Sequence, residues 1–132
     1  MAYIDTNVFL YVIDENSQKD FREASIGILK RVEEGEASAI SALTLMEVLW
    51  WCEKHTRARI KEIHDSILSY RTLEIINLTP DVISDALFFK EKYRLEINDC
   101  ISLATMASTG ITGIYSNDTG FDKVEWTKRT FK

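Results

Sequence analysis

Short strand-like segments alternate with longer helix-like segments along this 132-residue chain, and this alternation restricts the fold more than any other feature. The strand-like segments are brief apolar runs at residues 3–4, 37–40, 73–78, 113–116 and 124–127. The helix-like segments, several with apolar residues every three or four positions, are residues 21–32, 43–55, 60–68, 79–93 and 98–110. Strands that alternate with helices of this length form βαβ units. We therefore predict an α/β fold with a mainly parallel sheet covered by helices on both faces.

Some element boundaries carry a local signal. Residues 79–81 (Thr-Pro-Asp) combine a capping hydroxyl, a proline at the first helical position and an acid in the first turn. Asn98 is expected to cap the following helix, and Gly110 is placed to end it. Residues 5–7 (Asp-Thr-Asn) are expected to form a polar break after the first strand.

The chain has the length and composition of one globular domain, residues 1–132. It contains one proline, no linker-like stretch, 45% hydrophobic residues and 28% charged residues. Its longest apolar run, Val8–Ile13, is far shorter than the roughly 20 residues that span a bilayer. The first residues lack the basic region and cleavage site of a secretory signal. We expect a cytoplasmic protein that does not associate with membranes.

Acidic residues occur where an α/β sheet places its functional groups, just beyond the carboxyl ends of the strands. Asp5 follows the first strand and Asp118 follows the fourth. Asp99 lies in the first turn of a helix, and Glu47 lies in an apolar helical segment where an unpaired carboxylate is costly. Asp122 is close by in sequence. We predict that these acids form one catalytic cluster.

Each acid taken alone also has a structural explanation. Asp5 can end a strand, Asp99 can interact with the helix dipole, and Asp118 can belong to a turn. Several carboxylates that share a pocket, however, repel one another and raise their pKa values unless cations neutralise them. Mg²⁺ and Mn²⁺ prefer such oxygen ligands, and they promote phosphodiester hydrolysis. The cluster therefore indicates a metal-dependent phosphodiesterase.

The remaining charged and sulfur-containing residues give weaker signals. The net charge of −5 is unusual for a nucleic-acid enzyme, but bound cations reverse the local potential of an acidic site. Basic residues gather at 54–61 and 123–132, where a solvated surface is the simpler interpretation. Cys52 and His55 are one helical turn apart, yet zinc normally needs three or four ligands of this type. We expect both cysteines to be buried thiols.

Four segments together resemble the PIN-domain family, and within it the VapC-type ribonuclease toxins. The first is residues 3–10, YIDTNVFL, and the second is residues 40–48, ISALTLMEV. The third is Asn98-Asp99 followed by residues 101–107, ISLATMA, and the fourth is residues 114–118, IYSND, leading to Phe121-Asp122. Their order and spacing cover nearly the whole chain.

The resemblance implies a five-stranded parallel sheet of order 3-2-1-4-5 and cleavage of RNA that depends on Mg²⁺ or Mn²⁺. It implies that Asp5, Asp99 and Asp118 are metal ligands. It also implies that Glu47 orients the attacking water or completes a second metal site. The residues that match polar pocket-lining positions are Thr6, Asn7 and Ser116.

Two positions depart from the family pattern. Gly120 stands where many relatives have a further acid, so the participation of Asp122 is open. Ser116 replaces a threonine and keeps the hydroxyl. The resemblance also implies a small antitoxin partner and a homodimer. Aromatic residues for such surfaces, or alternatively for the core, are Trp50, Trp51, Phe88 and Phe89.

Two other functions remain open at this point. The first is a catalytically inactive domain of the same fold that acts as a binding or scaffold protein. The second is an aspartate-based phosphotransfer domain, either a receiver or a haloacid-dehalogenase type. The dehalogenase type needs an Asp two residues after the first, where this chain has Asn7.

Overall fold

A computed structural model describes residues 1–132, and its central element is a sheet of five parallel strands. The strands are β1 (Ala2–Ile4), β2 (Ser38–Ser41), β3 (Leu73–Ile76), β4 (Gly113–Tyr115) and β5 (Lys128–Thr130). Their order is β3-β2-β1-β4-β5, as predicted. Tyr3 of β1 lies opposite Ala39 on one side and Ile114 on the other. The α/β class and the parallel topology are thus confirmed.

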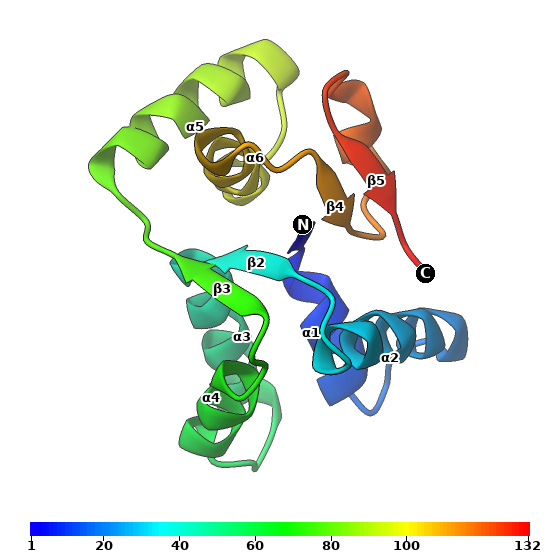
Figure 1. The fold of residues 1–132 in the computed structure, drawn as a ribbon. Helices are drawn as coiled ribbons and strands as arrows, with labels where there is room; N and C mark the ends of the chain where they lie inside the picture. Colours follow the sequence, from blue (N-terminus) through cyan, green and yellow to red (C-terminus); the bar gives the residue numbers. More distant parts are fainter.

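Helices cover both faces of this sheet (Figure 1). One face is covered by α5 (Pro80–Tyr93) and α6 (Ile97–Thr109). The other face carries α1 (Thr6–Ile13), α2 (Lys19–Glu33), α3 (Ala42–His55) and α4 (Ile60–Leu68). A short 3₁₀ helix, η1 (Thr119–Lys123), connects β4 to β5. No helix is long and apolar enough to cross a membrane.

The two faces contribute to two separate cores because successive strand residues point to opposite sides. Tyr3 and Ala39 pack with α5 and α6, whereas their neighbours Ile4 and Ile40 pack with the helices of the opposite face. All four residues are fully buried. The central strands are therefore covered on both faces, which explains why they appear in the sequence as short apolar runs and not as alternating patterns.

The polar break expected at residues 5–7 is wrong, because a helix begins there at once. Asp5 is the N-cap of α1, and its side chain accepts a hydrogen bond from the backbone N–H of Thr6. Val8 and Phe9 of this helix are buried against the sheet. The apolar run that follows Thr6 has no clear period, so the helix was not visible in the sequence pattern. The acidic residue at the end of β1 is thus fixed by helix capping.

The last strand also differs from its prediction, since it spans Lys128–Thr130 and not residues 124–127. Val124 is buried in the core, but it lies at the end of η1. The true strand is at the sheet edge, where Lys128 and Thr130 are exposed. An edge strand needs few apolar residues, so the apolar pattern marked the wrong segment.

The predicted boundaries of α5 and α6 are confirmed in part. Thr79 caps α5 through its side-chain oxygen, which accepts from Val82 N, and Gly110 ends α6 in a left-handed conformation. Asn98 is not the cap of α6, however, because the helix begins at Ile97 after Glu96. The side chain of Asn98 is used elsewhere, as described below.

Candidate active site at the carboxyl edge of the sheet

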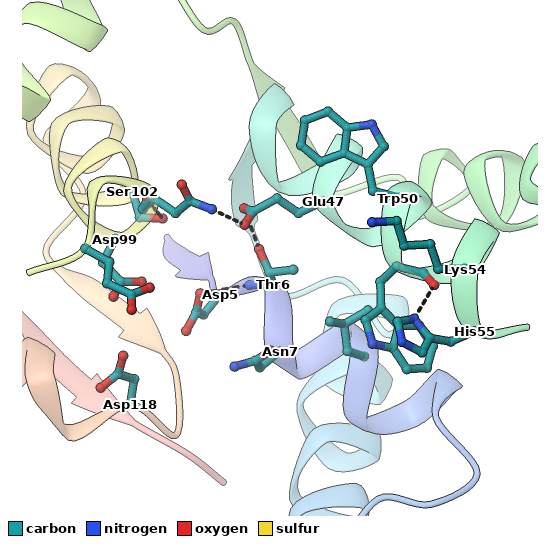
Figure 2. A pocket seen from close by; sticks show the side chains of 14 residues that line it. Asp5, Thr6, Asn7, Glu47, Trp50, Lys54, His55, Asp99, Ser102 and Asp118 are labelled. Atoms are coloured by element: carbon teal, nitrogen blue, oxygen red, sulfur yellow. Dashed lines mark hydrogen bonds between the residues drawn. The ribbon is translucent and has the colours of Figure 1, made fainter.

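The four predicted acids Asp5, Glu47, Asp99 and Asp118 all line one pocket of about 460 Å³ beyond the carboxyl ends of the strands (Figure 2). Asp5 and Asp118 follow the paired strands β1 and β4, and Asp5 N donates a hydrogen bond to Tyr115 O. Asp99 comes from the first turn of α6, and Glu47 comes from α3. The side chains of Asp5, Asp99 and Asp118 point toward the same space (Figure 2).

Asp5 is the most buried of these acids, with 8% of its surface exposed. One carboxylate oxygen accepts from Thr6 N at 2.9 Å, and the other accepts from Ser116 Oγ at 2.6 Å. Burial raises the pKa of Asp5, these two hydrogen bonds oppose the rise, and the charges of Asp118 and Glu47 add to it. The chain therefore fixes the orientation of this carboxylate but supplies no positive charge.

Ser116 connects Asp5 to Asp118. Its hydroxyl donates to Asp5 and accepts from Asp118 N at 3.0 Å. Ser116 is fully buried and does not line the pocket, which differs from its predicted position. Gly120 packs against the same turn, where a Cβ atom would lie 3.0 Å from Asp118 Oδ1. A side chain at position 120 would crowd the Asp118 carboxylate, which gives a local reason for glycine there.

Glu47 reaches the pocket because two partners from other elements hold it. Thr6 Oγ1 donates to Glu47 Oε1 at 3.0 Å, and Asn98 Nδ2 donates to Oε2 at 2.7 Å. These contacts satisfy a carboxylate within an otherwise apolar segment of α3. They also join α1, α3 and α6 at the pocket (Figure 2).

Asp99, like Asp5, has a raised pKa. Its pKa is raised to about 7, mainly by desolvation and then by the charges of Asp5, Asp118, Glu96 and Glu47. None of the ion pairs in the structure involves Asp5, Glu47, Asp99 or Asp118. Like charges in one site disfavour ionisation, so the pocket is stabilised by anything that brings positive charge.

The structure does not bring Asp122 into this pocket. Both of its oxygens accept from Arg129, at 3.0 Å from Nε and 3.1 Å from Nη2. The hydrogen bond from Arg129 lowers the pKa of Asp122. Arg129 Nη1 also donates to Ser116 O at 3.1 Å. The Asp122–Arg129 pair therefore braces the turn that carries Asp118.

Several pocket residues were not predicted as site residues. Thr6 and Asn7 line the pocket as expected, but so do Glu96, Asn98 and Ser102, as well as one face of α3. The residues of that face are Glu47, Trp50, Trp51, Lys54 and His55. Their spacing of three and four places them on successive turns of one helical surface. This periodicity, starting from Glu47, was available in the sequence and would have identified them.

The acidic pocket suits a hard divalent cation by the chemistry of its donors. No three His, Cys, Asp or Glu side chains lie close enough together to hold a metal ion by themselves. Mg²⁺, however, is usually bound by one or two carboxylates and keeps several waters. The oriented carboxylate of Asp5, together with Asp99 and Asp118 across the pocket, matches that mode of binding better than a closed cage of ligands.

Comparisons with known proteins agree with this fold. A family model for the PIN domain matches residues 2–127. A toxin–antitoxin complex from Klebsiella pneumoniae is 22% identical, with 97% of this chain and 96% of that chain covered and a TM-score of 0.71. VapC20 of Mycobacterium tuberculosis, described as a sarcin–ricin loop cleaving toxin, is 16% identical over 95% of each chain, with a TM-score of 0.75.

VapBC2 from Rickettsia felis, bound to a DNA fragment from its promoter, is 20% identical over 98% of each chain, with a TM-score of 0.66. No curated protein sequence matches the chain significantly. At these identities the likeness to solved structures concerns the fold, and the family follows from the match that covers residues 2–127.

Proposed function

This chain belongs to the PIN-domain family, and we propose that it is a divalent-metal-dependent endoribonuclease that hydrolyses RNA phosphodiester bonds. The observation that carries the proposal is the convergence of Asp5, Asp99 and Asp118 on one pocket, with none of the three in an ion pair with Lys or Arg. Negative groups of this density, held in place by the fold, favour cations and the phosphate groups that cations bind.

Each pocket residue has a distinct part in this proposal. Asp5, Asp99 and Asp118 would hold Mg²⁺ or Mn²⁺, and Asp5 is the most firmly oriented because Thr6 N and Ser116 Oγ both donate to it. The cation, when bound, lowers the pKa of a water molecule and stabilises negative charge on the phosphoryl group. Ser116 acts through Asp5 and Asp118 and is a positioning residue.

Glu47 is the residue best placed to handle a proton. Its two oxygens accept from Thr6 and Asn98, and each oxygen retains a lone pair for a further hydrogen bond. In hydrolysis the attacking water loses a proton as its oxygen bonds to phosphorus, and the departing ribose oxygen gains one. Glu47 would orient that water and accept its proton.

We further propose that the protein is the toxin of a toxin–antitoxin pair, with a small antitoxin protein as partner and a homodimer as its assembly. The support comes from similar folds. One is in a toxin–antitoxin complex, another is described as a sarcin–ricin loop cleaving toxin, and a third is bound to a promoter DNA fragment. A short neighbouring gene for a DNA-binding protein would identify the antitoxin.

A cleavage assay tests the enzymatic part. The purified protein is incubated with single-stranded RNA in the presence of Mn²⁺, Mg²⁺ or EDTA, beside the variants Asp5→Asn and Asp122→Asn. We expect cleavage by the native chain and by Asp122→Asn, and none by Asp5→Asn or with EDTA. Full activity of Asp5→Asn would refute the proposal.

A catalytically inactive binding protein of the same family is the second candidate. The observation that favours it is that no three acidic or other ligating side chains are close enough to chelate an ion. The two candidates differ in thermal stability with cations. A nuclease is stabilised by millimolar MnCl₂, since a ligand that binds only the folded state raises the melting temperature, whereas an inactive domain is unaffected. The phosphotransfer alternative receives no support, because the family match is to the PIN domain.

A further inference from the structure

Resting on the proposed ribonuclease function, we propose that one face of α3 binds an unpaired nucleotide of the RNA beside the cleavage site. We call this face, made of Trp50, Lys54 and His55, the α3 wall. In this proposal the indole of Trp50 stacks on a base, and the ammonium group of Lys54 binds a phosphate. The α3 wall thus sets how the substrate enters the acidic pocket.

The α3 wall is continuous with the catalytic acids. Glu47, Trp50 and Lys54 all line the same pocket, and they occupy successive turns of α3 (Figure 2). Seven residues of α-helix rise about 10 Å, so Lys54 lies roughly that far along the axis from Glu47. A nucleic-acid strand that passes Glu47 in this direction meets the indole first and the ammonium group second.

Trp50 has the features of a stacking surface. It lines the pocket and is 53% exposed, and its ring takes part in none of the aromatic contacts in the structure. Every nucleobase has a π-face, and unpaired bases stack on aromatic side chains of this kind. The carboxylates beside the indole repel a phosphate group but not an uncharged base. The base is therefore the part of the nucleotide that the indole is suited to bind.

Lys54 supplies positive charge that nothing in the protein neutralises. It is exposed, it takes part in no ion pair, and it is the only lysine or arginine that lines the pocket. A protein with a net charge of −5 must bind RNA through a few basic side chains, because contacts with phosphate dominate the affinity for RNA. Lys54 lies where such a contact helps most.

His55 closes the far side of the α3 wall. Its ring stacks on Trp51, with 4.6 Å between ring centroids and an interplanar angle of 17°. His55 Nδ1 lies 2.9 Å from Trp51 O. A carbonyl oxygen only accepts hydrogen bonds, so Nδ1 carries the hydrogen and Nε2 is left to contact a ligand.

A second cavity continues the path beyond the α3 wall. It measures about 500 Å³, it shares Trp51 and His55 with the acidic pocket, and it contains Arg57 as well as the acids Asp14 and Glu15. The two cavities together offer room for a strand longer than one nucleotide, with a basic residue in each. A single-stranded RNA is therefore a better occupant than a mononucleotide.

Binding and kinetics of α3-wall variants test the proposal. We expect Trp50→Ala to raise KM for a single-stranded RNA and its Kd by roughly 10-fold, with kcat changed far less, and Trp50→Phe to restore most of the affinity. Lys54→Gln should reduce the slope of log Kd against log salt by about one. Matched controls are Phe88→Ala, an exposed aromatic residue on α5, and Lys128→Gln, an exposed lysine at the opposite end of the sheet.

The Kd values are measured by fluorescence anisotropy in the Asp5→Asn background, so that cleavage does not interfere. If the native chain cleaves RNA but Trp50→Ala and Lys54→Gln keep native KM and Kd, the α3 wall does not bind RNA and is left for a protein partner. If the native chain cleaves no RNA, the proposed function fails. The anisotropy measurements then still decide separately whether the α3 wall binds a single strand.

Discussion

Asp99 and Asp122 are two acids at the same edge of the sheet, and they differ in the source of their counter-charge. Asp122 is bound through both oxygens by Arg129, and that contact lowers its pKa. Asp99 has no such partner, and desolvation together with the neighbouring acids raises its pKa to about 7. One carboxylate is neutralised by the chain itself, whereas the other is kept without a counter-ion.

This difference separates a structural acid from one that is available for chemistry. The Asp122–Arg129 pair is complete, and it braces the Ser116 backbone. Asp5, Asp99 and Asp118 take part in no ion pair, and the charges of neighbouring acids add to the raised pKa values of Asp5 and Asp99. Perturbed pKa values in a pocket are typical of functional sites. The acids of this region can thus be distinguished by whether a basic side chain of the protein already pairs with them.

The largest expected effect on activity comes from removing the charge of Asp99, the acid that has no basic partner. Asp99→Asn should lower kcat/KM for RNA cleavage by at least about 100-fold, because it removes a group that would hold the cation at the reacting phosphate. Asp122→Asn, with its charge already paired to Arg129, should change kcat/KM less than about twofold. Steady-state kinetics with Mn²⁺ measure both. Similar losses in the two variants would remove the distinction.

Glu47→Gln should have the next largest effect, a loss of roughly 10- to 100-fold in kcat with a smaller change in KM. The amide keeps the size of the side chain and can still accept from one of Thr6 and Asn98. It cannot accept a proton from water. A kcat for Glu47→Gln equal to that of the native chain would show that Glu47 only holds α1 and α6 together.

The two acids should also affect stability with opposite dependence on pH. The folded chain keeps the Asp99 proton up to about pH 7, whereas the unfolded chain loses it near the ordinary value of 3.8. The free energy of unfolding of the metal-free protein should therefore fall as pH rises from about 4 to 7. Asp99→Asn should remove about 1 kcal/mol of that fall, after allowance for solvent screening.

Denaturant unfolding at a series of pH values in EDTA measures this dependence. The Asp122 carboxylate, whose pKa is lowered, contributes stability above its unfolded pKa and loses it as pH falls through its folded pKa. Asp122→Asn should therefore alter only the acid limb. If the free energy of unfolding of the native chain changed between pH 4 and 7 in the same way as that of Asp99→Asn, the raised pKa of Asp99 would be contradicted.

The smallest expected effect is that of Asp122→Asn on thermal stability at pH 7. The pair with Arg129 is exposed on the Asp122 side, and surface ion pairs contribute little. The melting temperature should fall by no more than about 2 °C. Differential scanning calorimetry checks this value, and a much larger fall would mean that the pair anchors the Asp118 turn more strongly than the geometry indicates.

The sequence was sufficient for the fold class and for the acids that follow the strands. Asp5 and Asp118 could be placed because the carboxyl ends of parallel strands meet at one edge. The sequence was not sufficient to show that Asp122 lies outside the pocket. Its partner Arg129 lies on an edge strand, and the apolar pattern predicted that strand at the wrong residues. Edge strands are defined by backbone pairing, which leaves little trace in side-chain chemistry.

Side-chain partners across elements were also beyond the sequence. Asparagine is a residue type that often caps helices, yet the amide of Asn98 donates a hydrogen bond to Glu47 on another helix. Ser116 was expected to line the pocket as a polar residue, yet it is buried and its hydroxyl positions the carboxylate of Asp5. The contact of Asn98 depends on the packing of α3 and α6, and that of Ser116 depends on the pairing of β1 with β4. No local sequence pattern determines either.

Calorimetric titration with Mn²⁺ tests most directly whether the unpaired acids bind a divalent cation. The proteins titrated are the native chain, Asp99→Asn and Asp122→Asn. We expect saturable binding to the native chain and to Asp122→Asn with the same affinity, and binding to Asp99→Asn that is weaker by at least about 10-fold. Equal binding to all three proteins, or no binding to the native chain, would contradict the account.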